Sequence, residues 1–216
     1  MSFSVRAVCV VHALTADEGR VGVTAIDKRS VDGPVEVREL GLRGDVQADR
    51  EHHGGQWKAV YLLSDDDVAP WQDEFGGPIP PGYFGENLRV AGVDTSGLVI
   101  GIRLRVGEKL ELEITTPRVP CQTFARHVDR PRWVRRFTEQ GRPGAYARVV
   151  RPGSVAAGDG VELVVIPDHG VTVGDVFAGV TPDQARRLLD GSDLADLAPS
   201  LVRKLDPATD VRPSDE

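Results

Sequence analysis

Short apolar runs separated by turn residues dominate the first 166 residues of the chain. Residues 5–14 form a valine-rich run, and residues 35–40 alternate apolar and charged side chains. Residues 102–106 and 109–115 flank Gly107-Glu108, a connection typical of a β-hairpin. Further strands are predicted at residues 21–26, 58–63, 144–150 and 161–166. Many short strands with few helices predict a mainly β fold, a closed or nearly closed β-barrel with peripheral helices.

Two helices are predicted within this strand-rich part. Ser64 is an N-cap residue followed by three aspartates, which favour the positive end of a helix. Apolar residues then recur at a helical spacing until Gly76-Gly77-Pro78 ends the helix. A second, basic helix is predicted around residues 131–139.

The pattern becomes helical after residue 166. Thr172 and Thr181 occupy N-cap positions, and Gly179 and Gly191 follow at positions typical of helix ends. Three short helices are predicted, at residues 172–178, 181–190 and 193–204. We therefore expect a β-barrel domain over residues 1–166, a three-helix segment over residues 167–206 and a disordered tail over residues 207–216.

Composition excludes several classes of protein. The net charge is -7 and the sequence has no block of lysine and arginine, so a nucleic-acid polymer is not an expected partner. No apolar run approaches the length of a membrane helix. Two cysteines form neither a disulfide framework nor the four-thiolate set of an iron–sulfur cluster. This usage fits a reducing compartment, and we expect a cytoplasmic protein that does not associate with membranes.

One of the two cysteines, Cys121, lies in a stiff turn that follows a predicted strand. Pro117 and Pro120 fix their own φ angles and remove two backbone donors, so this turn can hold a thiol in one direction. Arg118 lies three residues away, and a nearby guanidinium increases the thiolate fraction of a cysteine. The alternative is that Cys121 is a small buried apolar residue.

Three other groups of residues are candidates for a binding site. Lys28 and Arg29 follow a strand and could bind a phosphate, or could be solvated. His53, Gly54 and Gly55 form a segment in which glycine permits close approach of a ligand, although a solvated loop explains it equally well. Glu86 and Asn87 could order a loop over a pocket, or Glu86 could bind its own backbone.

Five short motifs occur in an order that resembles the MOSC domain, the C-terminal type of domain of molybdenum-cofactor sulfurases. They are residues 25–31, Gly41-Leu42-Arg43-Gly44-Asp45, His53-Gly54-Gly55, Phe84-Gly85-Glu86-Asn87-Leu88 and Pro117-Arg118-Val119-Pro120-Cys121. The resemblance is greatest to the YiiM-like branch, whose members also carry a three-helix segment after the domain. Gln56-Trp57 departs from the pattern of that branch and leaves the local loop shape open.

The resemblance implies a molybdopterin-type molybdenum cofactor, with Cys121 as the metal ligand and catalytic centre. It places Lys28, Arg29, Arg118, His53, Gly54, Gly55, Glu86 and Asn87 around that cofactor. A thiolate suits a soft metal site, in agreement with this assignment. Pyridoxal phosphate is not an expected ligand.

The activity that the resemblance implies is reduction of N-hydroxylated compounds, including hydroxylamino-purines, as a detoxification reaction. Because the sequence has no flavin-type glycine motif and too few cysteines for a cluster, the expected electron donor is a separate flavin-type reductase. A homodimer is left open. One alternative is a non-catalytic carrier of the cofactor or of sulfur on Cys121. Another is a hydrolase in which Cys121 and a histidine act as nucleophile and base.

Overall fold

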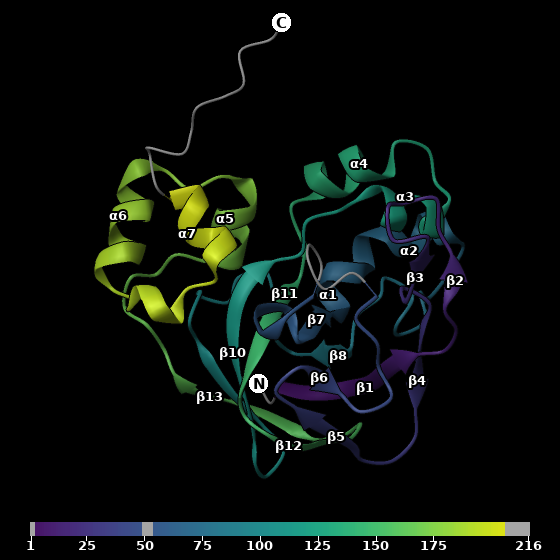
Figure 1. Ribbon diagram of the computed structural model, residues 1–216, viewed down its shortest axis with the longest axis horizontal. Helices are drawn as coiled ribbons and strands as arrows, with labels where there is room; N and C mark the ends of the chain where they lie inside the picture. Colours follow the sequence, from purple (N-terminus) through teal and green to yellow (C-terminus); the bar gives the residue numbers. More distant parts are fainter. Residues whose placement is uncertain (1–2, 49–53, 206–216) are drawn as a thin grey trace, which may run out of the picture.

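The computed structural model describes residues 3–48 and 54–205, except for the side chain of Leu194 (Figure 1). Seven strands of its main sheet form a closed barrel in the order β13-β9-β10-β11-β7-β8-β1, and β1 pairs with β13 to complete the circle. The barrel strands are β1 (Phe3–Val11), β7 (Val60–Ser64), β8 (Leu88–Ala91), β9 (Arg103–Val106), β10 (Leu110–Pro117), β11 (Ala145–Arg151) and β13 (Gly160–Val165). The predicted mainly β fold with a closed barrel is confirmed.

Strand β1 closes the barrel because it divides one of its edges between two partners. Its first residues, Phe3 and Ser4, pair with Val161 and Gly160 of β13. Its last residues pair with β4 (Lys28–Val31), an eighth strand that lies outside the closed ring. All barrel pairs are antiparallel except β7 and β8, which run parallel. A parallel pair needs a crossover, and residues 65–87 supply it.

Two small sheets stand beside the barrel. One contains β2 (Thr15–Ala16) and β3 (Val23–Thr24), and the other contains β12 (Gly153–Val155), β5 (Val35–Arg38) and β6 (Gly41–Leu42). The hairpin of β2 and β3 lies next to helix α3 (Figure 1). Arg126 of α3 donates two hydrogen bonds to Asp17, which lies between β2 and β3.

The crossover between β7 and β8 begins with a helix whose start the sequence fixes. Ser64 accepts a hydrogen bond from Asp67 N–H, and the Asp67 carboxylate accepts one from Ser64 N–H, so a capping box forms. The helix continues in three short pieces, α1 (Asp65–Val68), η2 (Ala69–Trp71) and α2 (Gln72–Phe75). Pro70 lies within the middle piece, where it removes a backbone donor, and Gly76 ends the last piece at a φ of 75°.

The core has two parts. Aliphatic side chains fill the barrel, and an aromatic cluster lies under the helices on one side of it. The large rings of that cluster are Trp71, Phe84, Phe124, Trp133 and Phe137, each at most 5% exposed. They join the crossover to helices α3 (Gln122–Val128) and α4 (Trp133–Gln140). The Phe124 ring of α3 meets three other rings of the cluster edge to face, with centroids 5.1 to 5.6 Å apart, and these contacts fix the position of α3. Helix α3 begins directly after Cys121.

The C-terminal helices form a group of their own at one side of the barrel (Figure 1). They are α5 (Val173–Ala178), α6 (Pro182–Asp190) and α7 (Pro199–Leu205), with the short helix η3 (Leu194–Asp196) before the last. Capping boxes at Thr172 and Thr181 start the first two helices, as predicted. The third predicted helix is divided into η3 and α7, because Pro199 takes the first position of a new helix.

Several local predictions were incomplete. Residues 122–128 form α3, which the sequence pattern did not indicate, and the predicted strand at residues 21–26 is reduced to Val23–Thr24. Residues 153–155, mostly assigned to a turn, pair with β5. The predicted tail at residues 207–216 lies outside the described residues. Among the described residues, every helix is too short or too polar to span a bilayer.

Candidate functional site

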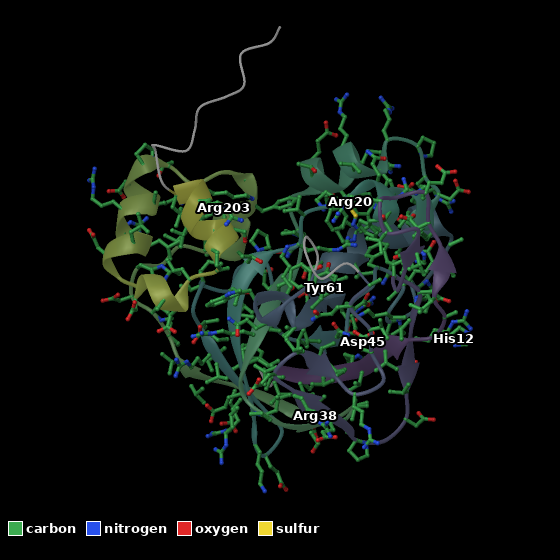
Figure 2. All side chains as sticks on the ribbon, in the orientation of Figure 1. His12, Arg20, Arg38, Asp45, Tyr61 and Arg203 are labelled. Atoms are coloured by element: carbon green, nitrogen blue, oxygen red, sulfur yellow. The ribbon has the colours of Figure 1, made fainter. Side chains whose placement is uncertain are left out.

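A cavity of about 350 Å³ opens between the barrel, the β2–β3 hairpin and helix α3. Its described walls come from the connection between β2 and β3, from β3 and β4, from the residues after β6, and from the beginning of β7. The turn after β10, helix α3 and β11 complete them. This volume falls within the range of small-molecule and cofactor sites. Arg20, Tyr61 and Asp45 line the cavity; in Figure 2 Arg20 lies at the level of α3, and Tyr61 and Asp45 lie below it.

Cys121 lines this cavity at the start of α3. The backbone is extended at Cys121, which is the N-cap residue of the helix, and its side chain makes no capping hydrogen bond. It is partly exposed and forms no disulfide. The other cysteine is different, because burial raises the pKa of the Cys9 thiol to about 12 and excludes it as a nucleophile. Cys121 is therefore the thiol that a ligand in the cavity can reach.

Arg118 also lines the cavity and is only 6% exposed. Its guanidinium carbon lies 3.5 Å from the ring centroid of Phe124 and 5.4 Å from that of Tyr61. Its Nη1 is buried without a hydrogen-bond partner. A buried guanidinium nitrogen without an acceptor is costly, so this atom indicates a place for an anionic or polar ligand group.

The described cavity wall carries more positive than negative charge. Five cationic side chains line it, namely Arg20, Lys28, Lys58, Arg118 and Arg126, against two carboxylates, Asp17 and Asp45. Both carboxylates are held in ion pairs. Asp45 binds Lys28 at 2.5 Å, and Asp17 binds Arg126 through two contacts of 2.8 and 2.9 Å. The excess of three positive charges favours an anionic ligand.

Asp17 connects the β2–β3 hairpin to helix α3 in the cavity wall. The Arg126 guanidinium, which donates to it from α3, holds the pKa of Asp17 near 2, and Thr123 donates to the same carboxylate. Since Asp17 belongs to the segment between β2 and β3, this contact fixes the hairpin against α3. At neutral pH, therefore, Asp17 is ionised and its ion pair with Arg126 is formed.

Asn87 is bonded to Asp45 in the cavity wall. Its amide nitrogen donates to Asp45 at 2.8 Å and to the Cys9 carbonyl at 3.3 Å, and its amide oxygen accepts from Tyr61 N–H. Asp45 also accepts from Val11 N–H. One amide thus joins β1, β7 and the segment after β6. Its short contacts are structural, although its side chain also lines the cavity.

Glu86 has no place in the described cavity wall. Its side chain is completely buried and accepts four hydrogen bonds, from Gly82 N–H, from Phe84 N–H and from two nitrogens of Arg89. The carboxylate thereby holds the turn that contains Gly85, which does line the cavity. The structure therefore favours the interpretation in which Glu86 binds its own backbone and orders a loop. It gives no support to a direct contact with a ligand.

Lys28 and Arg29 point in different directions, since neighbouring strand residues alternate. Lys28 lines the cavity, whereas the Arg29 side chain is 62% exposed, is absent from the described wall and pairs with Asp27. Gly54 and Gly55 are also outside the wall. Gly55 has a φ of 85° and donates to Gln47, which lines it. His53 lies outside the described residues.

Two tyrosines stand side by side at the cavity, with ring centroids 5.2 Å apart. Tyr61 donates its hydroxyl proton to the Pro143 carbonyl at 2.8 Å. Burial raises the pKa of Tyr146, and the positive charge of Arg118 partly offsets that effect. Tyr146 is therefore a protonated phenol at neutral pH, next to a buried guanidinium.

No histidine of the described residues lines the cavity. His127, on α3, bonds through Nε2 to the Tyr83 carbonyl, and burial lowers its pKa. His169, which is far from Cys121 in the sequence, is buried under the C-terminal helices. A cysteine–histidine pair for hydrolysis thus has no support within the described part of the chain. Nor do the described residues contain a cluster of three or more His, Cys, Asp or Glu side chains arranged for a metal.

The structure therefore brings together four predicted residues, Lys28, Asn87, Arg118 and Cys121. It adds residues that the sequence reasoning missed, namely Asp17, Arg20, Lys58, Arg126 and Tyr146. Asp45 belongs to one of the quoted motifs but had received no role. None of the added residues has a local signal, because they come from four separate segments: the connection between β2 and β3, the residues before β7, helix α3 and β11.

Comparison with known proteins is decisive about the family. Residues 49–162 match the model of the MOSC domain. The chain belongs to the MOSC domain family. Protein YiiM of Escherichia coli is 33% identical over 180 residues, which cover 80% of each chain. Protein YflK of Bacillus subtilis is 31% identical over 156 residues, 72% of this chain and 70% of that protein.

Solved structures agree with the YiiM-like assignment. The crystal structure of Escherichia coli YiiM superposes with a TM-score of 0.72 at 26% identity, covering 97% of this chain and 92% of that one. The structure of YiiM from Geobacillus stearothermophilus has a TM-score of 0.75 at 20% identity, with 94% and 97% covered, and supports the fold. A Gibberella moniliformis protein named a reductase is 32% identical over 148 residues, 67% of this chain but 26% of its own length.

Proposed function

We propose that this MOSC domain protein is a molybdenum-dependent oxidoreductase that reduces N-hydroxylated compounds such as hydroxylamino-purines. The observation that carries the proposal is a reachable thiol, Cys121, in the wall of a cavity with excess positive charge. A soft thiolate suits molybdenum, and cationic side chains suit the phosphate of a molybdopterin. The fungal relative named a reductase supports a redox role.

The described residues fit such a cofactor. Arg118 supplies a buried donor without an acceptor, which a phosphate or pterin oxygen would satisfy. Lys28 of β4 and Arg126 of α3 line the cavity, are each paired with a carboxylate and would set the limits of the anionic ligand. Cys121 would hold the metal. Glu86 would act at a distance by fixing the turn, whereas Asn87, which lines the cavity, would fix the strands on which the cavity is built.

Reduction of an N-hydroxyl group consumes two electrons and two protons and yields an amine and water. The cofactor, when bound, supplies the two-electron couple, and a separate flavin-type reductase is proposed as the source of electrons. The protein binds and orients the substrate. We assign to Tyr146 a hydrogen bond to the substrate hydroxyl, since it is a protonated phenol in the same cavity as Cys121.

Elemental analysis tests the proposal directly. The protein is purified from a molybdate-fed host that makes the cofactor, as wild type, Cys121→Ser and Cys9→Ala. We expect near-stoichiometric molybdenum in the wild type and in Cys9→Ala, and at least a tenfold loss in Cys121→Ser. Metal-loaded wild type should then reduce an N-hydroxylated purine with a chemical electron donor.

The alternative, a carrier of cofactor or sulfur on Cys121, predicts a different outcome. A carrier would show molybdenum or persulfide on Cys121 but no turnover of N-hydroxylated compounds with any donor. Absence of molybdenum from the wild type, in a host shown to make the cofactor, would contradict both the reductase and the cofactor carrier.

A further inference from the structure

The hairpin of β2 and β3, residues 15–24, lines one side of the cavity without belonging to the core. Six of its residues, between Asp17 and Thr24, are part of the cavity wall. None of its residues is buried, and none belongs to the aliphatic or the aromatic part of the core. Among the described strands, β2 and β3 pair only with each other. A two-stranded hairpin is marginally stable by itself, so its position depends on contacts outside its own ladder.

A cluster of hydrogen bonds around Asp17 supplies such contacts. The Asp17 carboxylate accepts two hydrogen bonds from the Arg126 guanidinium, at 2.8 and 2.9 Å, and one from the Thr123 hydroxyl at 2.9 Å. Both donors lie on α3, the helix that begins directly after Cys121. The Asp17 side chain is only 9% exposed, although Ala16 and Glu18 on either side of it are exposed. Polar contacts rather than core packing therefore hold the hairpin to α3.

Gly19 lies directly against this cluster. A Cβ on Gly19 would lie 2.6 Å from Asp17 Oδ2, 3.5 Å from Arg126 Nη2 and 3.6 Å from Thr123 Oγ1. The φ of Gly19 lies outside the left-handed region, so an alanine there would meet the cluster without backbone strain. The absence of a side chain thus lets the hairpin approach α3 closely enough for the Asp17 contacts to form.

We infer that residues 15–24 form a lid over the cavity, and that the cluster of Asp17, Thr123 and Arg126 holds this lid closed. Opening of the lid breaks polar contacts of a partly exposed ion pair and leaves both parts of the core intact, so it costs far less than unfolding of the barrel. The lid and Cys121 line the same cavity, so opening gives bulky molecules access to the thiol. The inference does not depend on which ligand the cavity binds.

Hydrogen exchange and thiol labelling of the full chain test the inference. The protein is purified from a host that lacks the molybdenum cofactor, so Cys121 carries no metal whether or not the proposed function holds. Gly19→Ala displaces the Asp17 carboxylate without a change of charge, and Asp17→Asn removes the ion pair. Glu18→Gln is the matched control, because it removes one negative charge from the same hairpin at an exposed position outside the described cavity wall.

Amide exchange of residues 15–24, followed by mass spectrometry, should be about fivefold faster in Gly19→Ala and Asp17→Asn than in the wild type, as expected for the loss of one partly exposed ion pair. Labelling of Cys121 is compared between iodoacetamide, a small neutral reagent, and a maleimide that carries a polyethylene glycol chain. Both reagents react with the thiolate, so the ratio of the two rates cancels changes in the thiolate fraction. The ratio of maleimide to iodoacetamide labelling should rise about fivefold in the two lid variants and stay at the wild-type value in Glu18→Gln.

Three results would overturn the inference. The first is unchanged exchange of the hairpin in both lid variants, and the second is faster exchange that leaves the labelling ratio of Cys121 unchanged. The third is an equal response of Glu18→Gln, which would assign the effect to charge. Circular dichroism and thermal unfolding verify that each variant is folded, as expected for a hairpin outside the core. Neither measurement involves molybdenum, so failure of the lid and failure of the proposed function give different results.

Discussion

Replacement of Glu86 by alanine should destabilise the protein more than it affects any ligand contact. The carboxylate is completely buried and accepts hydrogen bonds from two backbone N–H groups and from Arg89. Its removal leaves two backbone donors without acceptors. Arg89, whose side chain is only 4% exposed, then keeps a single, longer ion pair, with Asp65 at 3.8 Å.

The magnitude follows from these contacts. Breaking a buried ion pair by removing one partner costs about 3–5 kcal/mol, and the orphaned backbone donors belong to the same network, so their costs do not simply add. We expect a loss of about 4 kcal/mol, a large part of the 5–15 kcal/mol that is typical of a domain. For a chain of this size, that loss lowers Tm by roughly 10 °C. Glu86→Gln, which keeps the shape but places an amide donor against a donor, should lose about half as much.

Thermal and urea unfolding of the two Glu86 variants provides the measurement, with Glu108→Ala at an exposed hairpin position as the control. Molybdenum content is measured on the same samples. A loss of less than about 1 kcal/mol in Glu86→Ala would refute the reasoning, since it lies below the range for a buried ion pair. Unchanged stability together with lost molybdenum would instead indicate that Glu86 contacts the cofactor directly.

Two further predictions concern single positions. Gly82 has a φ of 87°, and a Cβ there would lie 2.4 Å from the Lys28 carbonyl oxygen, so Gly82→Ala should cost about 2 kcal/mol or more and should lower the denaturant midpoint. His169 is buried, bonds through Nε2 to the Ile100 carbonyl and accepts at Nδ1 from Val171 N–H, and burial lowers its pKa. Because the pKa of His169 is lower in the folded than in the unfolded protein, the stability that neutral His169 provides is complete above about pH 6.5. This stability is lost as the pH falls below that value, so Tm measured from pH 7.5 to 5 should decrease.

Each of these has a control on the same chain. Gly76→Ala, at a φ of 75° but with open space around its Cβ, separates backbone strain from the clash at Gly82. Equal losses at the two glycines would contradict the close approach to Lys28. His169→Gln should flatten the acid limb of the stability curve, and an unchanged limb would assign it to other groups.

Helix caps, turns and helix ends could be predicted from the sequence. Ser64, Thr172 and Thr181 each form the capping box or cap that their residue types favour, because an N-cap depends on three or four neighbouring residues. The hairpin at Gly107 and the helix end at Gly76 follow for the same reason. The motif order, likewise a property of the sequence alone, indicated the MOSC domain family and the closed barrel. The predicted domain boundaries stay predictions.

Tertiary structure decided which of the candidate residues share a site. Lys28 and Arg29 are neighbours in sequence, yet only Lys28 lines the cavity, because a strand sends them to opposite faces. Glu86 is buried in an ion pair with Arg89 and holds a loop. Asp17, Arg126 and Tyr146 meet at the cavity from segments more than a hundred residues apart at the extremes. No local pattern encodes such meetings, since they depend on how β1 divides its edge, on the parallel pair of β7 and β8, and on the aromatic cluster that positions α3.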